Sequence, residues 1–308
     1  MARATRELKL SGVFASAITP RRADSQDPDF SGLLDLLDFL SDGGVAGVCL
    51  FDTAGEFLNY SFAERQRLLY LGSKRTRVPL IVGVSHSTFA GALQLADEAI
   101  SSGADALLIM APYFYRYSQR QLEEFFVQFA RETGDAVPLL IHNLPQATST
   151  LEFDLMRRLI DTGRFAGVND SSGDAMLFEQ LTSLRQSTPF ALFNGNDRSA
   201  PESLRAGADG LISPAACALP ELLASLARAT SSPGHAVPGP MAILLTEFLD
   251  WTERFPFPVA IKRAVELRGQ KSAPPLTPLA PETAQALAEF STWFTGWLPQ
   301  TRKVAAHG

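Results

Sequence analysis

The chain has 308 residues, of which 46% are hydrophobic and 19% charged, and its formal net charge at pH 7 is −6. This composition is typical of a globular protein with ample material for a core, and it excludes a chain that is disordered throughout. Basic residues form only short pairs such as Arg21-Arg22, so we expect no nucleic-acid partner. No apolar segment reaches the roughly 18 residues needed to cross a bilayer, so we expect no membrane partner.

The first apolar segment, Gly12–Ile18, superficially resembles a signal peptide, but it is short and ends in Thr19-Pro20, so we interpret it as a strand. The two cysteines, Cys49 and Cys217, lie far apart in apolar surroundings, without the spacing of a zinc site or a disulfide scaffold. We therefore expect two reduced thiols in the core of a cytoplasmic protein.

Eight short apolar runs recur along the first two thirds of the chain. Near-continuous hydrophobic stretches of this length are typical of strands that are buried on both faces of a parallel sheet. The predicted strands are Val13–Thr19, Val45–Phe51, Leu80–Val84, Ala106–Met110, Pro138–Ile141, Phe165–Val168, Phe190–Phe193 and Gly210–Ile212.

Segments with helical periodicity lie between these strands. Ser61–Glu64 and Ser118–Gln121 have the capping-box pattern that begins a helix, and glycines such as Gly44 and Gly103 end helices shortly before the next strand. Eight strands alternating with helices predict a closed (β/α)8 barrel, the TIM barrel.

After the eighth strand only helices are expected. They are predicted at Leu222–Ala229, Met241–Arg254, Val259–Leu267 and Pro281–Trp297, with a break at Ser231–Gly234. We therefore divide the chain into a barrel over residues 1–228, a C-terminal helical extension packed on it over 229–300, and a disordered tail over 301–308.

Reacting groups in such barrels lie where strands end, so the segments that directly follow the predicted strands are the ones expected to carry the chemistry. Asp52-Thr53-Ala54-Gly55-Glu56 resembles the Gly-Thr-Thr-Gly-Glu loop of the dihydrodipicolinate synthase and N-acetylneuraminate lyase family. Three further segments are similar to the family's Pro-Tyr-Tyr, Tyr-Asn-x-Pro and Gly-x-Lys-[Asp/Glu]-Ser-Ser-Gly-Asp motifs. They are Ala111-Pro112-Tyr113-Phe114, His142-Asn143-Leu144-Pro145 and Gly167-Val168-Asn169-Asp170-Ser171-Ser172-Gly173-Asp174. The resemblance runs from about Gly12 to Leu298.

The resemblance implies a reaction in which a lysine forms a Schiff base with a 2-oxo acid, and here Asn169 matches that lysine. An amide nitrogen is delocalised into its carbonyl and cannot form an imine, so we expect no Schiff-base chemistry. The family's relay tyrosine is matched by His142, the tyrosine from a neighbouring subunit by Phe114, and the second threonine of the carboxylate-binding loop by Ala54. The arginine that holds a second substrate in the synthases falls near Ala147.

We predict that His142, Asn169 and Thr53 carry any catalysis. A histidine transfers protons near neutral pH, and strand alternation directs His142 and Asn169 into the barrel mouth. The alternative is a buried histidine satisfied by a backbone carbonyl, beside a structural asparagine. The predicted substrate-binding residues are Ala54, Gly55, Tyr113, Asn196, Asp197 and Ser213.

No metal or cofactor is expected. The chain has no HxH, HxxxH or paired-carboxylate spacing, and its glycine-rich pieces match neither a dinucleotide-binding fingerprint nor a phosphate-binding loop.

The leading hypothesis is a lyase-like family member that binds a small 2-oxo acid or a sugar-derived carboxylate at the barrel mouth, with acid–base catalysis at His142. One alternative is a catalytically inactive pseudoenzyme with a binding or regulatory role. A second is an ordinary 2-oxo acid aldolase or synthase that uses another lysine. The chain has Lys9, Lys74, Lys262, Lys271 and Lys303. The resemblance also implies a homotetramer, a dimer of dimers, in which Phe114 packs across an interface.

Overall fold

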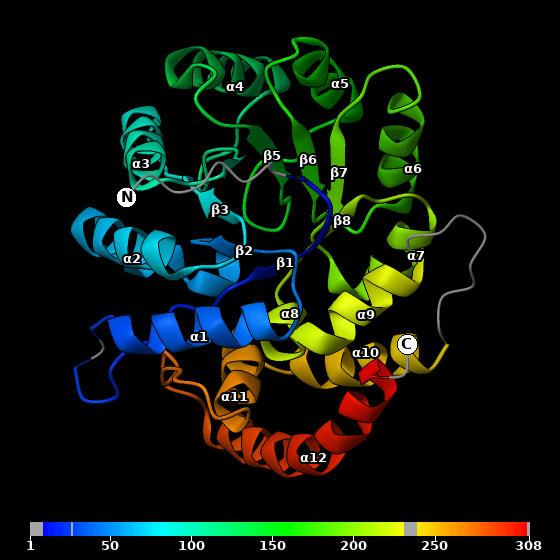
Figure 1. Cartoon of the computed structure of the whole chain (residues 1–308). Coiled ribbons are helices and arrows are strands. Elements are labelled where there is room, and N and C mark those ends of the chain that lie inside the picture. Colours follow the sequence, from blue (N-terminus) through cyan, green and yellow to red (C-terminus); the bar gives the residue numbers. More distant parts are fainter. Residues whose placement is uncertain (1–8, 26, 231–238, 307–308) are drawn as a thin grey trace.

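The computed structural model describes residues 9–25, 27–230 and 239–306, and its centre is a closed barrel of eight parallel strands in chain order (Figure 1). The strands are β1 (Gly12–Ser16), β2 (Gly47–Leu50), β3 (Leu80–Gly83), β4 (Ala106–Met110), β5 (Leu139–Asn143), β6 (Gly167–Asp170), β7 (Ala191–Asn194) and β8 (Gly210–Ser213). β1 pairs with both β2 and β8, which closes the barrel. The predicted (β/α)8 fold is therefore confirmed.

Helices follow the strands and surround the barrel (Figure 1). They are α1 (Phe30–Asp42), α2 (Phe62–Arg75), α3 (Phe89–Ser102), α4 (Gln119–Thr133), α5 (Phe153–Asp161), α6 (Ala175–Leu184) and α7 (Ala200–Arg205). Both predicted capping boxes are confirmed, since Ser61 caps α2 with Glu64 and Ser118 caps α4 with Gln121. Such reciprocal bonds satisfy backbone donors that a helix leaves free at its start.

The barrel has two separate sets of buried side chains, because successive residues of a strand point to opposite faces. A small cluster with one or two members from each of seven strands fills the interior, where the rings of Phe14 and Phe193 meet edge to face with centroids 5.6 Å apart. The larger cluster lies between the strands and the helices. Leu140 belongs to the inner set, so His142, two residues later, also points inward.

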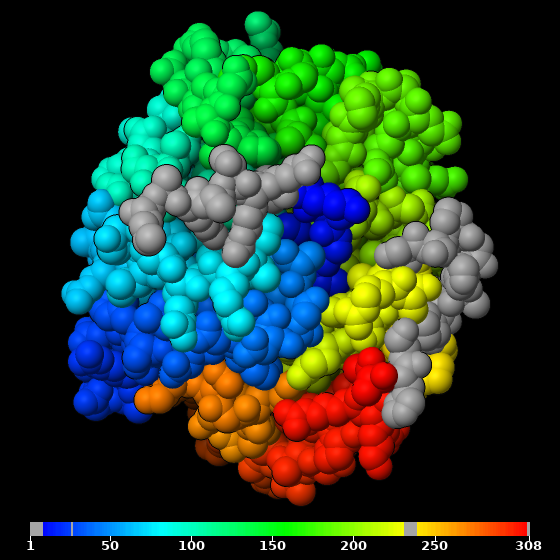
Figure 2. All heavy atoms as spheres, in the orientation of Figure 1, coloured from blue at the N-terminus to red at the C-terminus, as the bar shows by residue number. Residues whose placement is uncertain are grey.

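In the residues that the structure describes after β8, the regular elements are all helices. It comprises α8 (Ala215–Ala218), α9 (Pro220–Thr230), α10 (Gly239–Thr252), α11 (Val259–Leu267) and α12 (Pro281–Ala306). Figure 2 shows the orange and red C-terminal helices as one continuous block along the side of the barrel, beside the blue of α1. Phe248 of α10 packs against Phe290, Phe294 and Trp297 of α12, which holds this block together. The break expected at Ser231–Gly234 lies outside the described residues.

The prediction of a disordered tail over residues 301–308 is wrong for its described part. Helix α12 continues to Ala306, and its last turns are packed rather than free. Thr301 and Ala305 are buried, and the Ser225 hydroxyl of α9 donates a hydrogen bond of 2.9 Å to the Ala305 carbonyl. Packing against α9 therefore stabilises a helix end that the sequence alone suggested would fray.

Candidate functional site

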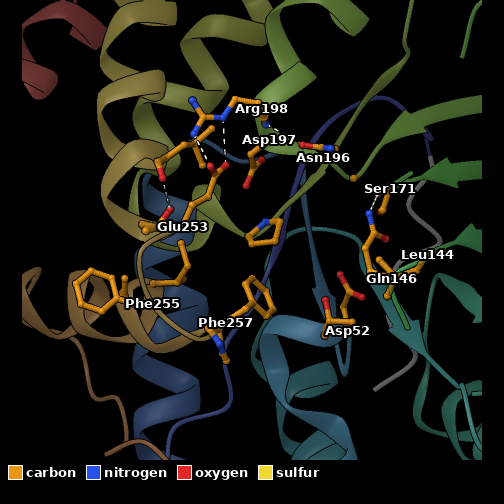
Figure 3. Close-up of a pocket in the computed structure, with 18 of the residues that line it drawn as sticks. Asp52, Leu144, Gln146, Ser171, Asn196, Asp197, Arg198, Glu253, Phe255 and Phe257 are labelled. Carbon is orange, nitrogen blue, oxygen red and sulfur yellow. Dashed lines mark hydrogen bonds and ion pairs between the residues drawn. The ribbon is translucent and has the colours of Figure 1, made fainter. Parts of the chain in front are cut away.

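A cavity of about 500 Å³ opens at the carboxyl ends of the strands. Residues at the ends of β2, β5, β6, β7 and β8 form part of its wall. The end of α10, the start of α11 and the connection between them form the rest of the described lining. In Figure 3, Asp52, Gln146 and Ser171 lie on one side of this cavity, with Glu253 and Phe255 on the opposite side. The site is thus built from the barrel and the C-terminal extension together.

His142 lies near the end of β5 and is almost completely buried, with 2% of its surface exposed. Its Nε2 lies 3.0 Å from Ser171 Oγ, and its Nδ1 lies 3.7 Å from Asp52 Oδ1, which is longer than a hydrogen bond. Burial lowers the pKa of His142, although Asp52 and Asp170 act in the opposite direction. The imidazole is therefore neutral at pH 7 and can accept a proton.

Asp52 follows β2 directly and is also buried. Phe51 before it has a left-handed φ of 59°, which turns the chain as it leaves the strand. The Asp52 Oδ2 atom accepts a hydrogen bond of 2.8 Å from Ser16 Oγ, whereas Oδ1 has no hydrogen-bond partner among the described residues. One carboxylate oxygen is thus held by β1 and the other faces His142.

Asn169 of β6 pairs with His142 of β5 in the barrel and is 1% exposed. Neither its Nδ2 nor its Oδ1 has a hydrogen-bond partner within the described part of the chain. Leaving a buried polar group unpaired costs about 1–3 kcal/mol, so such atoms are commonly the ones that a ligand contacts. Asn169 lies just behind the cavity wall, next to Ser171 and Gly195.

No lysine is among the described residues that line the cavity. Lys262 of α11 is buried, but its Nζ is 2.9 Å from Glu56 Oε2 and donates to the Pro274 carbonyl at 3.2 Å. The other four lysine side chains are exposed: Lys9, Lys74, Lys271 and Lys303. None of the described lysines therefore places an amine in this cavity, as a Schiff base formed by another lysine would require.

The structure brings some of the predicted site residues together and separates others. Thr53, His142, Asn196 and Asp197 line the cavity. Ser213, predicted to bind substrate, lies fully buried behind Asp197 and donates a hydrogen bond to its carboxylate.

Three further predicted substrate-binding residues do not line the cavity. Ala54 and Gly55 are buried in a short 3₁₀ helix, η1 (Thr53–Gly55). Tyr113 is directed elsewhere, and its ring packs edge to face on Phe57 with centroids 6.0 Å apart. Tyr113 therefore packs beside the barrel mouth and does not line the cavity.

Charge in the cavity wall is mainly negative. Asp197 is desolvated, which raises its pKa to about 6, although hydrogen bonds from Ser213 and the Ala215 N–H favour the ionised form. Arg198 is held by Glu253, with bonds of 2.6 and 3.1 Å, and by Asp250 at 2.8 Å. The one cation among the described lining residues is thus already neutralised by carboxylates.

Sequence reasoning missed two site residues, Asp52 and Ser171. Both had a signal, because Asp52 ends the second strand directly before Thr53, and Ser171 follows Asn169 by two residues and so faces the same side of the strand. The wall from the α10–α11 connection had no such signal, because residues such as Glu253 and Phe255 are distant in sequence from the strand ends.

The described residues contain no group of three or more His, Cys, Asp or Glu side chains that could hold a metal ion. No helix in them is both long and apolar enough to cross a membrane. Cys49 and Cys217 are free and buried, as predicted, and burial raises the pKa of the Cys217 thiol to about 12, so it is not a nucleophile near pH 7.

Comparisons with known proteins give a consistent result. The profile of the dihydrodipicolinate synthetase family matches residues 9–295. The 4-hydroxy-tetrahydrodipicolinate synthase of Methanopyrus kandleri is 31% identical over 304 residues, which cover 95% of this chain and 98% of the relative. The protein of the same name from Neisseria meningitidis is 29% identical over 283 residues, with 91% and 96% covered.

Solved structures agree with these relatives. A putative dihydrodipicolinate synthetase from Pseudomonas aeruginosa is similar with a TM-score of 0.85 and 26% identity, covering 94% of this chain and 99% of that one. A prophage protein of the dihydrodipicolinic acid synthase family from E. coli K12, solved in complex with pyruvate, has a TM-score of 0.85. It is 24% identical and covers 93% of this chain and 98% of its own.

Proposed function

The chain belongs to the dihydrodipicolinate synthetase family, and on that premise we propose that it is a lyase-like barrel that works without a Schiff base. Its ligand is a small 2-oxo acid or a sugar-derived carboxylate, bound at the barrel mouth. The observation that carries the proposal is the buried pair of His142 and Asn169 on neighbouring strands, beside a cavity with no lysine among its described lining residues.

In this proposal Asn169 occupies the position of the family's Schiff-base lysine. An amine attacks a carbonyl through its free electron pair, and an amide nitrogen has none to offer. The Asn169 amide instead donates to or accepts from an oxygen of the ligand, because both of its polar atoms lack other partners among the described residues. The ligand therefore forms no imine with the protein at this position.

His142 is the acid–base group. It is neutral near pH 7 because burial lowers its pKa, and the cavity wall that it forms also includes Thr53. Since Arg198 is occupied by Glu253 and Asp250, a carboxylate would be held by neutral donors such as the Thr53 hydroxyl. We therefore expect modest affinity for anionic ligands.

A thermal-shift panel of 2-oxo acids and sugar acids, with chromatographic detection of turnover, tests this function. A true ligand stabilises the folded state by about 2.7 kcal/mol at one hundred times its Kd. His142→Ala should keep the shift and lose turnover by about 100-fold or more.

The matched control is His86→Ala, because His86 does not line the cavity and its hydrogen bonds within the described residues are to Thr88, at 2.9 and 3.0 Å. Turnover that is the same in His142→Ala as in the wild type contradicts the role of His142. A ligand that shifts the melting temperature but is never turned over favours the pseudoenzyme alternative.

The assembly that we propose is a homotetramer. Phe114 has a left-handed φ of 80° and is 85% exposed, and its ring meets that of Tyr115, 66% exposed, with centroids 5.0 Å apart. Exposed aromatic pairs of this kind mark protein contacts. Light scattering on the eluting protein should give the mass of four chains, and Phe114→Ser should lower it. A monomer at every concentration contradicts this assembly.

The compartment that we propose is the cytoplasm. Cys49 and Cys217 are both free and buried, which suits a reducing compartment.

A further inference from the structure

Three side chains from separate strand ends form a chain across the cavity floor. Ser171 Oγ lies 3.0 Å from His142 Nε2, and the other ring nitrogen, Nδ1, lies 3.7 Å from Asp52 Oδ1. All three residues are buried and all three line the cavity. A hydroxyl, an imidazole and a carboxylate in this order are the parts of an activated serine nucleophile.

We propose that Ser171 is a nucleophile for acyl transfer, with His142 as its general base and Asp52 as the group that orients His142. The substrate class is a small, uncharged ester or lactone of a hydroxy acid or sugar acid. This inference rests on the proposed function for the place of the site, since hydrolysis of such a lactone releases the sugar-derived carboxylate proposed above.

The two ring nitrogens of His142 have different roles in this arrangement. With its hydrogen on Nδ1, the neutral ring leaves the Nε2 electron pair for the Ser171 hydroxyl and directs N–H toward Asp52. His142 Nδ1 and Asp52 Oδ1 have no other hydrogen-bond partner in the described chain, and they face each other. A shift of less than 1 Å would pair both, and such bonds commonly tighten when a substrate binds.

A hydrogen bond from Ser16 orients Asp52 toward His142. Its Oδ2 accepts from Ser16 Oγ at 2.8 Å, which fixes the carboxylate so that Oδ1 remains directed at the ring. A buried carboxylate in this position keeps the histidine in one tautomer and stabilises the imidazolium that forms when the serine proton is transferred.

Asn169 supplies a donor for the negative charge that develops on the carbonyl oxygen. A Cβ atom at Gly195 would lie 2.0 Å from Ser171 Oγ and 2.9 Å from Asn169 Nδ2, so the hydroxyl and the amide approach the same point in space. The Nδ2 group has no partner among the described residues. An unpaired N–H beside a nucleophile is the arrangement that stabilises an oxyanion.

Charge in the cavity favours an uncharged substrate. Asp52, Asp197 and Glu253 line it, and Arg198 is bound by carboxylates. An ester or lactone enters without repulsion, whereas the carboxylate that its hydrolysis forms is repelled, which favours product release.

The reaction balances without a cofactor. The Ser171 O–H bond breaks, its proton moves to His142 Nε2, and Oγ bonds to the carbonyl carbon as the carbonyl electron pair moves to oxygen. When that pair returns, the bond from carbon to the leaving alkoxide oxygen breaks, and the alkoxide takes the proton from His142. Water then attacks the acyl carbon and loses a proton to His142, the bond from that carbon to Ser171 Oγ breaks, and His142 returns the proton to Oγ. The net change is ester plus water to acid plus alcohol.

Labelling with a small alkyl fluorophosphonate, followed by intact and peptide mass spectrometry, tests the proposal. Ser171 Oγ should displace fluoride and give one adduct, mapped to Ser171. Ser171→Ala should give none, while His142→Ala and Asp52→Asn should each slow labelling by about 100-fold or more.

The matched control is Ser172→Ala, since Ser172 bonds to Asp170 at 2.8 Å and does not line the cavity. It should be labelled at the wild-type rate. The proposal is overturned by an absence of adduct, by an adduct on another residue, or by equal labelling rates in the wild type and His142→Ala. The thermal-shift panel reports on the proposed function independently, because ligand binding there needs no nucleophile.

Discussion

Replacing Gly195 by alanine perturbs the site most directly. The new Cβ would lie 2.0 Å from Ser171 Oγ and 2.9–3.0 Å from the two polar atoms of the Asn169 side chain. Both distances are shorter than van der Waals contact, so Ser171 must rotate away and break its 3.0 Å contact with His142. Overpacking costs about 1–3 kcal/mol, and the lost buried hydrogen bond adds about 1 kcal/mol. We expect the free energy of unfolding to fall by about 2–4 kcal/mol.

Urea unfolding and fluorophosphonate labelling together measure this effect. The control is Gly296→Ala in α12, where an added Cβ meets no atom within 4 Å and alanine favours a helix by about 1 kcal/mol over glycine. Gly195→Ala should lose stability and most of its labelling, whereas Gly296→Ala should lose neither. A Gly195→Ala variant with wild-type stability and wild-type labelling would show that Ser171 and Asn169 do not meet there.

Three further predictions concern buried charges. Lys262→Met should lower the free energy of unfolding by about 3 kcal/mol, because it leaves the largely buried Glu56 carboxylate without its cation. The double variant with Glu56→Gln should recover part of this loss in a double-mutant cycle. Burial raises the pKa of Asp197 in the folded state to about 6, above the usual aspartate value of 3.8, so ionising this group costs stability as pH rises through that window. The full shift corresponds to about 3 kcal/mol, and the cost is smaller to the extent that water reaches this partly exposed carboxylate. We therefore measure the free energy of unfolding in urea between about pH 4 and 7. For Asp197→Asn it should fall less with rising pH than for the wild type, or should rise. Parallel pH dependences in the two proteins would contradict this role of Asp197. Because burial lowers the pKa of His142, the labelling rate should have its midpoint below pH 6.5, and a midpoint at or above that value contradicts the assigned base.

The barrel was predictable because its strands are buried on both faces, which makes them short continuous apolar runs. The ends of these runs were less predictable. β5 and β6 extend through Asn143 and Asp170, polar residues that the sequence alone suggested were already loop. Asn143 donates to Asp170 at 2.7 Å, so the two side chains satisfy each other in a buried position and allow the ladder to continue.

Of the residues at the candidate site, only those in segments that resemble the family's motifs could be placed there from the sequence. His142, Asn169 and Thr53 were found from the strand ends, whereas Asp52 and Ser171 gained their meaning from distances between strands that one sequence does not give. The helix at Thr301 was also not predictable from the sequence. Its order comes from burial against α9, a tertiary contact, whereas residues near a terminus are usually expected to be disordered.

We propose that no amine among the described residues can form an imine at the barrel mouth. Borohydride reduction of the wild-type protein in the presence of pyruvate, followed by intact-mass measurement, tests this proposal. The mass should be unchanged, because Asn169 cannot condense with a keto acid and Lys262 is held by Glu56. A reduced pyruvate adduct mapped to any lysine of the chain would contradict the claim.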